Sequence, residues 1–244
     1  MAFAQTSLRN DINLKAYYKF DSGNLYADET GSFNLSAGGT PVAGTGKFTG
    51  ALSSNGRTGY ATISNDLGIT SGAFSMGGWF KLDNVIASGT SPWVFFEKSE
   101  ASAHVYMVLF YEWNGGTPRF RVYRDKGGGA GNIEPTHNVT LSAGVWYHIL
   151  ITYSGTTLKL YLNNAEVLSG TQSGTGSSGY GDLTSILTAV DLAGGAYKVD
   201  GSVDDFVVFN RELTSGEVST IYSSPLDPTG GANIMFFGGG VTIG

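Results

Sequence analysis

The chain has 244 residues, a formal net charge of −6 and no cysteine. The lack of cysteine excludes disulfide bonds and thiolate metal sites, and the acidic balance argues against nucleic acid as a partner, because nucleic-acid-binding domains are usually basic. Charged residues make up only 14%, aromatic residues make up 13%, and 37 residues are glycine. Such a composition is typical of short strands joined by tight turns, and one all-β domain can reach this length.

Strand patterns recur along the chain, bounded by clusters of Gly, Asn, Asp and Ser. In chain order, we predict strands at residues 14–20, 60–63, 74–82, 93–98, 104–113, 119–124, 146–153, 157–163, 166–168 and 203–209. Apolar residues alternate with period 2 wherever a segment is long enough to test, as at Leu158, Leu160 and Leu162. This alternation predicts antiparallel sheets that each have one buried face.

A single short helix is predicted at residues 213–222, where Thr214 and Glu217 have the spacing of a capping box. Crossover helices are missing from the pattern, which excludes a parallel α/β sheet, and no repeat of 20–50 residues indicates a solenoid or propeller. No apolar run approaches the ~18 residues of a membrane-spanning helix, and no signal-peptide pattern is visible. The sequence therefore predicts an all-β, two-sheet antiparallel jelly-roll sandwich with one short C-terminal helix and an extended C-terminal tail.

Eight segments carry a family resemblance in their order along the chain. They are LKAYYKFD at 14–21, ADETG at 27–31, GKFTGAL at 46–52, YATI at 60–63, FSMGGWFK at 74–81, WYHI at 146–149, YSGTTLKLYLN at 153–163 and GSVDDFVVFNREL at 201–213. Together they resemble the concanavalin A-like lectin/glucanase superfamily, in its laminin G-like (pentraxin-like) branch. The resemblance implies a jelly roll at residues 12–224 that binds glycans or proteins, with a lead at 1–11 and a Gly-rich apolar tail at 225–244.

Three aspartates are the candidate metal ligands. The resemblance implies that Asp21, Asp28 and Asp204 lie close together and hold Ca²⁺, which prefers six to eight hard oxygen ligands. Three carboxylates at one sheet edge would repel one another unless a cation lay between them. The alternative is that Asp21 and Asp28 cap turns and that Asp204 is solvated. Asp205 is expected on the opposite face from Asp204 if their strand is regular.

The sequence predicts that the chain is not an enzyme. Glycoside hydrolysis needs two carboxylates on either side of the scissile bond, and the Glu-x-Asp-x-x-Glu strand that the resemblance would imply for a glucanase is absent. Glu97 and Glu100 are three residues apart, which places them on opposite faces of a strand. The histidines at 104, 137 and 148 lie in no catalytic motif, and His148 is expected to be a packed strand residue.

Arg119, Arg121 and Tyr123 alternate along one predicted strand and share one of its faces. Guanidinium and aromatic groups together suit sugar stacking or acidic partners. These three residues are therefore the candidate ligand-binding residues, and the alternative is an ordinary solvated sheet face.

The C-terminal tail is Gly-rich but contains a short apolar segment, formed by Ile234, Met235, Phe236 and Phe237. An exposed apolar segment of this kind is a binding site or an aggregation hazard. A neighbouring subunit could take it as an added strand, giving a homo-oligomer, or it could fold back on its own domain.

Three functions remain open on this basis. The first is a non-enzymatic structural or attachment component of a larger assembly, such as a phage or virus virion protein or a surface fibre, located on a virion or cell surface. The second is a stand-alone carbohydrate-binding lectin module, with or without a dependence on Ca²⁺. The third is a polysaccharide hydrolase or lyase, which the missing paired-carboxylate strand disfavours.

Overall fold

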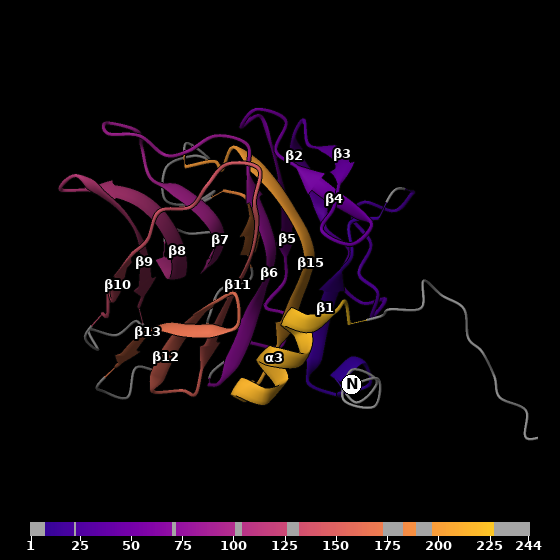
Figure 1. Cartoon of the computed structure of the whole chain (residues 1–244). Coiled ribbons are helices and arrows are strands. Elements are labelled where there is room, and N and C mark those ends of the chain that lie inside the picture. The colour runs from indigo at the N-terminus through magenta and orange to yellow at the C-terminus, as the bar shows by residue number, and fades with distance from the viewer. Residues whose placement is uncertain are drawn as a thin grey trace, which may run out of the picture.

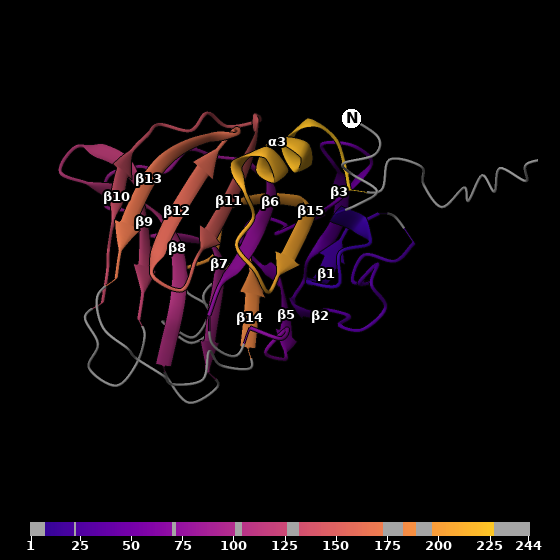
Figure 2. The same cartoon turned by 90° about the horizontal axis from the view of Figure 1, so that it is seen from below.

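The computed structural model describes residues 8–21, 23–69, 72–100, 104–125, 132–172, 183–188 and 197–226. These residues form two antiparallel sheets that face each other across a common core (Figures 1 and 2). The helix α3 (Ser215–Ser223) packs against the outside of one sheet.

The larger sheet has eight strands within the described residues. Seven of them follow one another in the order β13 (Ala165–Thr171), β12 (Thr157–Leu162), β11 (Trp146–Tyr153), β6 (Phe74–Leu82), β15 (Gly201–Phe209), β4 (Gly50–Ser53) and β3 (Val42–Thr45). The eighth, β1 (Leu14–Tyr18), also pairs with β15. Because β6, β11 and β15 lie in the middle of the sheet, their outward side chains have neighbours on both sides.

The second sheet has seven strands in the described part of the chain. Their order is β10 (Thr136–Asn138), β9 (Thr117–Arg124), β8 (His104–Asn114), β7 (Trp93–Glu100), β14 (Leu183–Ile186), β5 (Gly59–Ser64) and β2 (Ser36–Gly39). β8 and β9 pair in unbroken register, from Met107 opposite Arg124 to Asn114 opposite Thr117. Residues on their outer face therefore lie in regular cross-strand rows.

The core lies between the inner faces of the two sheets. Phe80 of β6 meets Phe95 of β7 edge-on at a ring separation of 5.0 Å and meets Phe206 of β15 at 6.3 Å. All three rings are buried, and burying one phenylalanine contributes about 1.5–3 kcal/mol. The period-2 alternation in the sequence supplies these inward residues from every long strand.

Two adjacent glycines allow the central strands of the larger sheet to approach closely. A Cβ atom at Gly77 would lie 2.2 Å from the carbonyl oxygen of Ile149, and the φ angle of Gly77 is +153°. A Cβ atom at Gly78 would lie 2.8 Å from the carbonyl oxygen of Asp205. The Gly-Gly pair in β6 thus makes room for an irregularity in β15, where the register shifts between Asp204 and Val207.

The helix α3 begins where the sequence predicts. The Thr214 hydroxyl accepts a hydrogen bond from the Glu217 amide, and the Glu217 carboxylate accepts one from the Thr214 amide, which completes the capping box. Val218 and Ile221 of the helix pack against Tyr17 and other residues on the outer face of the larger sheet. This face is therefore partly covered by the chain itself.

The predicted fold class is confirmed, and each of the ten predicted strands corresponds to a strand of the structure. Five further strands, β2, β3, β4, β10 and β14, were not predicted because they have only three or four residues and little alternation. No helix within the described ranges is long and apolar enough to cross a membrane. The apolar tail segment at 234–237 lies outside the described residues.

Candidate functional site

The first candidate site is the outer face of β8 and β9. Phe120 and Val122 enter the core, as the alternation predicts, so Arg119, Arg121 and Tyr123 lie on the opposite face. The register places each of them beside an outward residue of β8. The pairs are Arg119 with Glu112, Arg121 with Phe110, and Tyr123 with Val108.

Glu112 holds both guanidinium groups in place. Its Oε1 atom accepts hydrogen bonds from Arg119 Nε at 2.9 Å, Arg119 Nη2 at 2.7 Å and Arg121 Nε at 3.0 Å, and its Oε2 atom accepts one from Arg121 Nη2 at 3.1 Å. Burial acts to raise the pKa of Glu112, but the hydrogen bonds from Arg121 and Arg119 hold this pKa below its usual value. Charge-assisted forks of this kind fix the orientation of the guanidinium planes.

Aromatic rings lie beneath and beside these charges. The Arg121 guanidinium carbon is 4.0 Å from the centre of the Phe110 ring, and Tyr197 meets Phe110 edge-on at 6.3 Å. The Tyr123 hydroxyl accepts a hydrogen bond from Asn132 Nδ2 at 2.9 Å. We call this surface the Arg–Tyr face and define it by Arg119, Arg121, Tyr123, Phe110 and Tyr197. Sequence reasoning did not find Tyr197, because it lies in no predicted strand.

The second candidate site is the rim at Asp21 and Asp204. Asp204 Oδ2 accepts hydrogen bonds from the amides of Lys47 at 2.7 Å and Phe48 at 3.0 Å. Asp21 Oδ1 accepts hydrogen bonds from the Gly50 amide at 3.1 Å and from the Thr49 hydroxyl. The structure thus brings these two predicted ligands together around the turn between β3 and β4, where both hold the backbone of the turn.

Asp28 has a different role in the structure. Its carboxylate accepts hydrogen bonds from the amides of Tyr17 at 2.9 Å, Thr30 at 3.0 Å, Ser32 at 3.2 Å and Phe33 at 3.0 Å, and from the Thr30 hydroxyl. This arrangement matches the turn-capping alternative that the sequence left open for Asp28. Its two oxygens are engaged with the protein, so they are poorly placed to bind a metal ion with Asp21 and Asp204.

Asp205 joins Asp204 on the same side of the sheet. The expectation that it would lie on the opposite face assumed a regular strand, and it is wrong because β15 bulges here, with Asp205 at a φ of 46°. The Asp205 carboxylate accepts a hydrogen bond from the Tyr17 hydroxyl, which belongs to the outer cluster under α3. Burial and the neighbouring Asp204 raise the pKa of Asp205 to about 8, and burial is also the main cause that raises the pKa of Asp204 to about 6.

The rim meets the requirements of a calcium site only in part. Carboxylate oxygens are suitable ligands, and Asp204 Oδ1 is buried with no hydrogen-bond partner among the residues that the structure describes. However, within the described ranges no group of three or more His, Asp or Glu side chains is placed to hold a metal ion. Of the three predicted ligands, Asp21 and Asp204 share this rim, whereas Asp28 caps a separate turn.

A row of buried polar side chains crosses the centre of the larger sheet. His148 of β11 and Asp204 of β15 both lie opposite Trp79 of β6. Neither ring nitrogen of His148 has a hydrogen-bond partner in the described part of the chain, and burial lowers the pKa of His148 to about 3. The Trp79 ring lies 5.3 Å from His148 and stacks on Tyr222 of α3 at 5.4 Å. His148 is thus a packed, neutral strand residue, as the sequence predicts.

Solved structures with the same fold include several binding domains. Domain 4 of AbnA, an extracellular arabinanase from Geobacillus stearothermophilus in complex with arabinotriose, matches with a TM-score of 0.62 at 18% identity, over 86% of this chain and 98% of that one. The botulinum neurotoxin serotype D ligand-binding domain in complex with N-acetylneuraminic acid matches with a TM-score of 0.65 at 13% identity, over 90% of this chain. The match covers 52% of that domain, so this chain spans about half of its length.

A family model gives the sequence-level assignment. Residues 55–219 match the Laminin_G_3 model, described as concanavalin A-like lectin/glucanases superfamily. No curated protein matches the chain. The family match extends over more than half of the sequence and agrees with the two-sheet sandwich. The chain belongs to the concanavalin A-like lectin/glucanase superfamily.

Proposed function

We propose that this chain is a non-catalytic glycan-binding domain that contacts its ligand through the Arg–Tyr face. The observation that carries the proposal is the pair of guanidinium groups fixed by Glu112, with Arg121 lying over Phe110. Holding polar groups in place before binding lowers the entropic cost of association. The face therefore combines oriented hydrogen-bond donors with ring surfaces, which is what a sugar ring requires.

Charge balance and exposure also support this assignment. The ion pairs of Arg119 and Arg121 with Glu112 and Glu134 balance two positive charges against two negative ones. The two arginine side chains keep 23% and 21% of their surface exposed, so a ligand can reach part of each guanidinium group. Similar folds whose structures contain arabinotriose or N-acetylneuraminic acid make glycans the first ligand class to test.

The test is a broad glycan array probed with the wild type, Arg121→Gln and Tyr123→Phe. Gln removes the charge and the planar fork, whereas Phe removes only the hydroxyl group. Losing a hydrogen bond to a charged group costs about 1.5–3 kcal/mol, so Arg121→Gln should weaken binding at least tenfold. Arg57→Gln is the matched control, because Arg57 is equally part-exposed but lies outside the Arg–Tyr face. Silence of the wild type across the array would overturn the proposal.

A structural or attachment role in a larger assembly, such as a virion protein or surface fibre, is the second candidate. Its support is the apolar tail sequence at 234–237. Leu226, buried in the cluster under α3, marks the end of the described domain. A chain truncated after residue 226 keeps the described domain and removes the tail. If the tail joins subunits, light scattering will give a multimer for the full chain and a monomer for the truncated one. Equal masses would exclude assembly through the tail.

Calcium binding at the rim is a separate proposal. Its support is Asp204 Oδ1, which has no hydrogen-bond partner in the described part of the chain, and the proximity of Asp21, whose charge contributes to the raised pKa of Asp204. Saturating Ca²⁺ at 100 times its Kd would stabilise the domain by about 2.7 kcal/mol, and chelator would reverse the effect. Asp204→Asn should abolish this response and Asp28→Asn should not. An unchanged melting temperature of the wild type on Ca²⁺ addition would contradict calcium binding.

We also propose that the domain has no hydrolase activity. Glu112, the carboxylate at the Arg–Tyr face, forms hydrogen bonds with two arginines and has a lowered pKa, which is unsuited to a general acid. Incubating the strongest array ligand with the protein should release no reducing sugar. Measurable turnover that Glu112→Gln abolishes would contradict this.

A further inference from the structure

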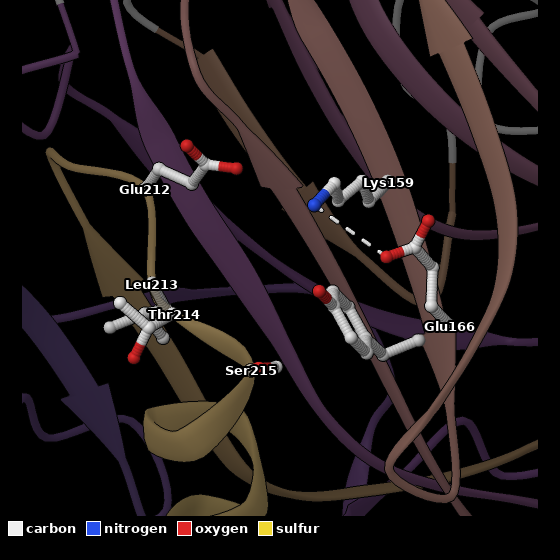
Figure 3. Close-up of a pocket in the computed structure, with 7 residues that line it drawn as sticks. Lys159, Glu166, Glu212, Leu213, Thr214 and Ser215 are labelled. Carbon is white, nitrogen blue, oxygen red and sulfur yellow. Dashed lines mark ion pairs between the residues drawn. The ribbon is translucent and has the colours of Figure 1, made fainter.

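A separate polar pocket opens on the opposite sheet, beside the start of α3. Its volume is about 290 Å³, and it lies between β12, β13 and the segment that leads into the helix. Figure 3 shows side chains from these three elements around one opening. The lining residues are Lys159, Tyr161, Glu166, Glu212, Leu213, Thr214 and Ser215. None of them belongs to the Arg–Tyr face or to the rim.

The two walls of the pocket carry complementary hydrogen-bonding groups. On one wall, Lys159 Nζ lies 3.6 Å from Glu166 Oε2, and both side chains are partly exposed, at 33% and 42%. On the other wall, Glu212 points toward Lys159 across the opening (Figure 3). Its backbone carbonyl accepts a hydrogen bond from Arg211, whereas its carboxylate has no hydrogen bond or ion pair within the described residues. Burial raises the pKa of Tyr161, the charge of Lys159 acts against this shift, and the charges of Glu166 and Glu212 add to it. An ammonium donor and carboxylate acceptors thus face the same space.

The charges around the pocket restrict the kind of ligand. Two glutamates and one lysine give it a net negative charge, which disfavours phosphate, uronic acids and sialic acid. The helix N-terminus does not compensate, because the capping box already engages the amides of Thr214 and Glu217. The pocket is also at the lower end of the about 300–1,000 Å³ of small-molecule sites, so the ligand must be small, polar and uncharged or cationic.

We propose that this pocket, called the helix-side pocket, binds one neutral sugar unit of a glycan. Sugar hydroxyl groups both donate and accept hydrogen bonds, so a single ring can donate to Glu212 and accept from Lys159. The inference rests on the proposed glycan-binding function and extends it, because the domain then has two glycan sites on opposite sheets. Two sites on opposite sheets would let one domain connect two separate glycan chains.

The experiment is a set of ¹H–¹⁵N correlation spectra of the ¹⁵N-labelled full chain, titrated with D-galactose, D-glucose, L-arabinose and N-acetylneuraminic acid. We expect at least one neutral sugar to shift the amide signals of Lys159, Glu166, Glu212 and Ser215, and N-acetylneuraminic acid to leave them in place. Glu212→Gln should weaken this binding about tenfold, since a hydrogen bond to a charged group is lost. Glu29→Gln, which neutralises an exposed carboxylate elsewhere, should have no effect.

The outcomes separate this inference from the proposed function. The helix-side pocket would be supported if a neutral sugar shifts the amide signals of its lining residues, if Glu212→Gln weakens this response, and if Arg121→Gln leaves it unchanged. Shifts confined to β8 and β9 would overturn it while leaving the Arg–Tyr face intact. Stronger pocket shifts with putrescine than with any sugar would also overturn it and would identify an amine site instead. A thermal melt of Glu212→Gln confirms that the variant is folded.

Discussion

His148 provides a quantitative test of the buried polar row. The side chain is fully buried, its two ring nitrogens have no hydrogen-bond partner among the described residues, and it packs against both Trp79 and Tyr222. His148→Phe keeps an aromatic ring in this space and removes the titratable group. Phenylalanine is larger than histidine, so the variant is expected to lose about 1–3 kcal/mol of stability through overpacking. This loss does not depend on pH.

The pH dependence of stability is the informative quantity. Burial lowers the pKa of His148 from 6.5 to about 3, so the unfolded chain binds the proton more readily than the folded chain. The stability that the neutral ring contributes is fully present above pH 6.5 and is lost as the pH falls toward 3. Between pH 7.5 and pH 4.0 the loss from His148 alone is about 3 kcal/mol, because each pKa unit corresponds to roughly 1.4 kcal/mol.

Urea unfolding at pH 7.5 and pH 4.0 measures this loss of stability. Both pH values lie away from the isoelectric point near 5.0, where the protein is least soluble. The wild type should lose about 3 kcal/mol more than His148→Phe between the two pH values. Carboxylates, including Asp204 and Asp205 with their raised pKa values, are common to both proteins and cancel in the difference. His137→Gln, at a part-exposed position, should behave like the wild type. Equal losses in the wild type and His148→Phe would refute the reasoning.

Two further predictions concern stability. Asp28→Ala leaves four backbone amides without their acceptor and should lower the free energy of unfolding by about 4 kcal/mol, with or without chelator. The control Asp66→Ala removes only one such hydrogen bond and should lower the free energy of unfolding far less. A loss of stability in Asp28→Ala that is seen only without chelator would contradict the capping role of Asp28. Thr214→Ala removes the helix cap and should lower the free energy of unfolding by about 1 kcal/mol, which a thermal melt measures. Thr214→Ser should restore most of this stability. An unchanged melting temperature of Thr214→Ala would contradict the role of Thr214 as a cap.

The fold could be predicted from the sequence because its long strands alternate strictly. Residues 119–124 and 157–163 have apolar residues at every second position, and both are strands with the predicted inward faces. The capping box at Thr214 is equally local, so its spacing was sufficient to locate α3. The short strands β2 and β3 contain only small or exposed residues and are defined by their pairing with β5 and β4. Pairing of that kind has no signature in the strand's own sequence.

The candidate sites were harder to predict because they depend on contacts distant in sequence. The alternation placed Arg119 and Arg121 on one face, but it could not indicate that Glu112 would hold both guanidinium groups. The sequence also could not distinguish Asp28 as a turn cap from Asp28 as a metal ligand. Asp205 was assigned to the wrong face because the bulge in β15 is made possible by Gly78 on the neighbouring strand.

The most direct test of the central claim is the dissociation constant of the strongest array glycan, measured by isothermal titration calorimetry for the wild type and Arg121→Gln. If the Arg–Tyr face is the binding surface, the variant will bind at least tenfold more weakly, which corresponds to about 1.4 kcal/mol. Arg57→Gln will bind as the wild type does. Equal dissociation constants for the wild type and Arg121→Gln would contradict the account.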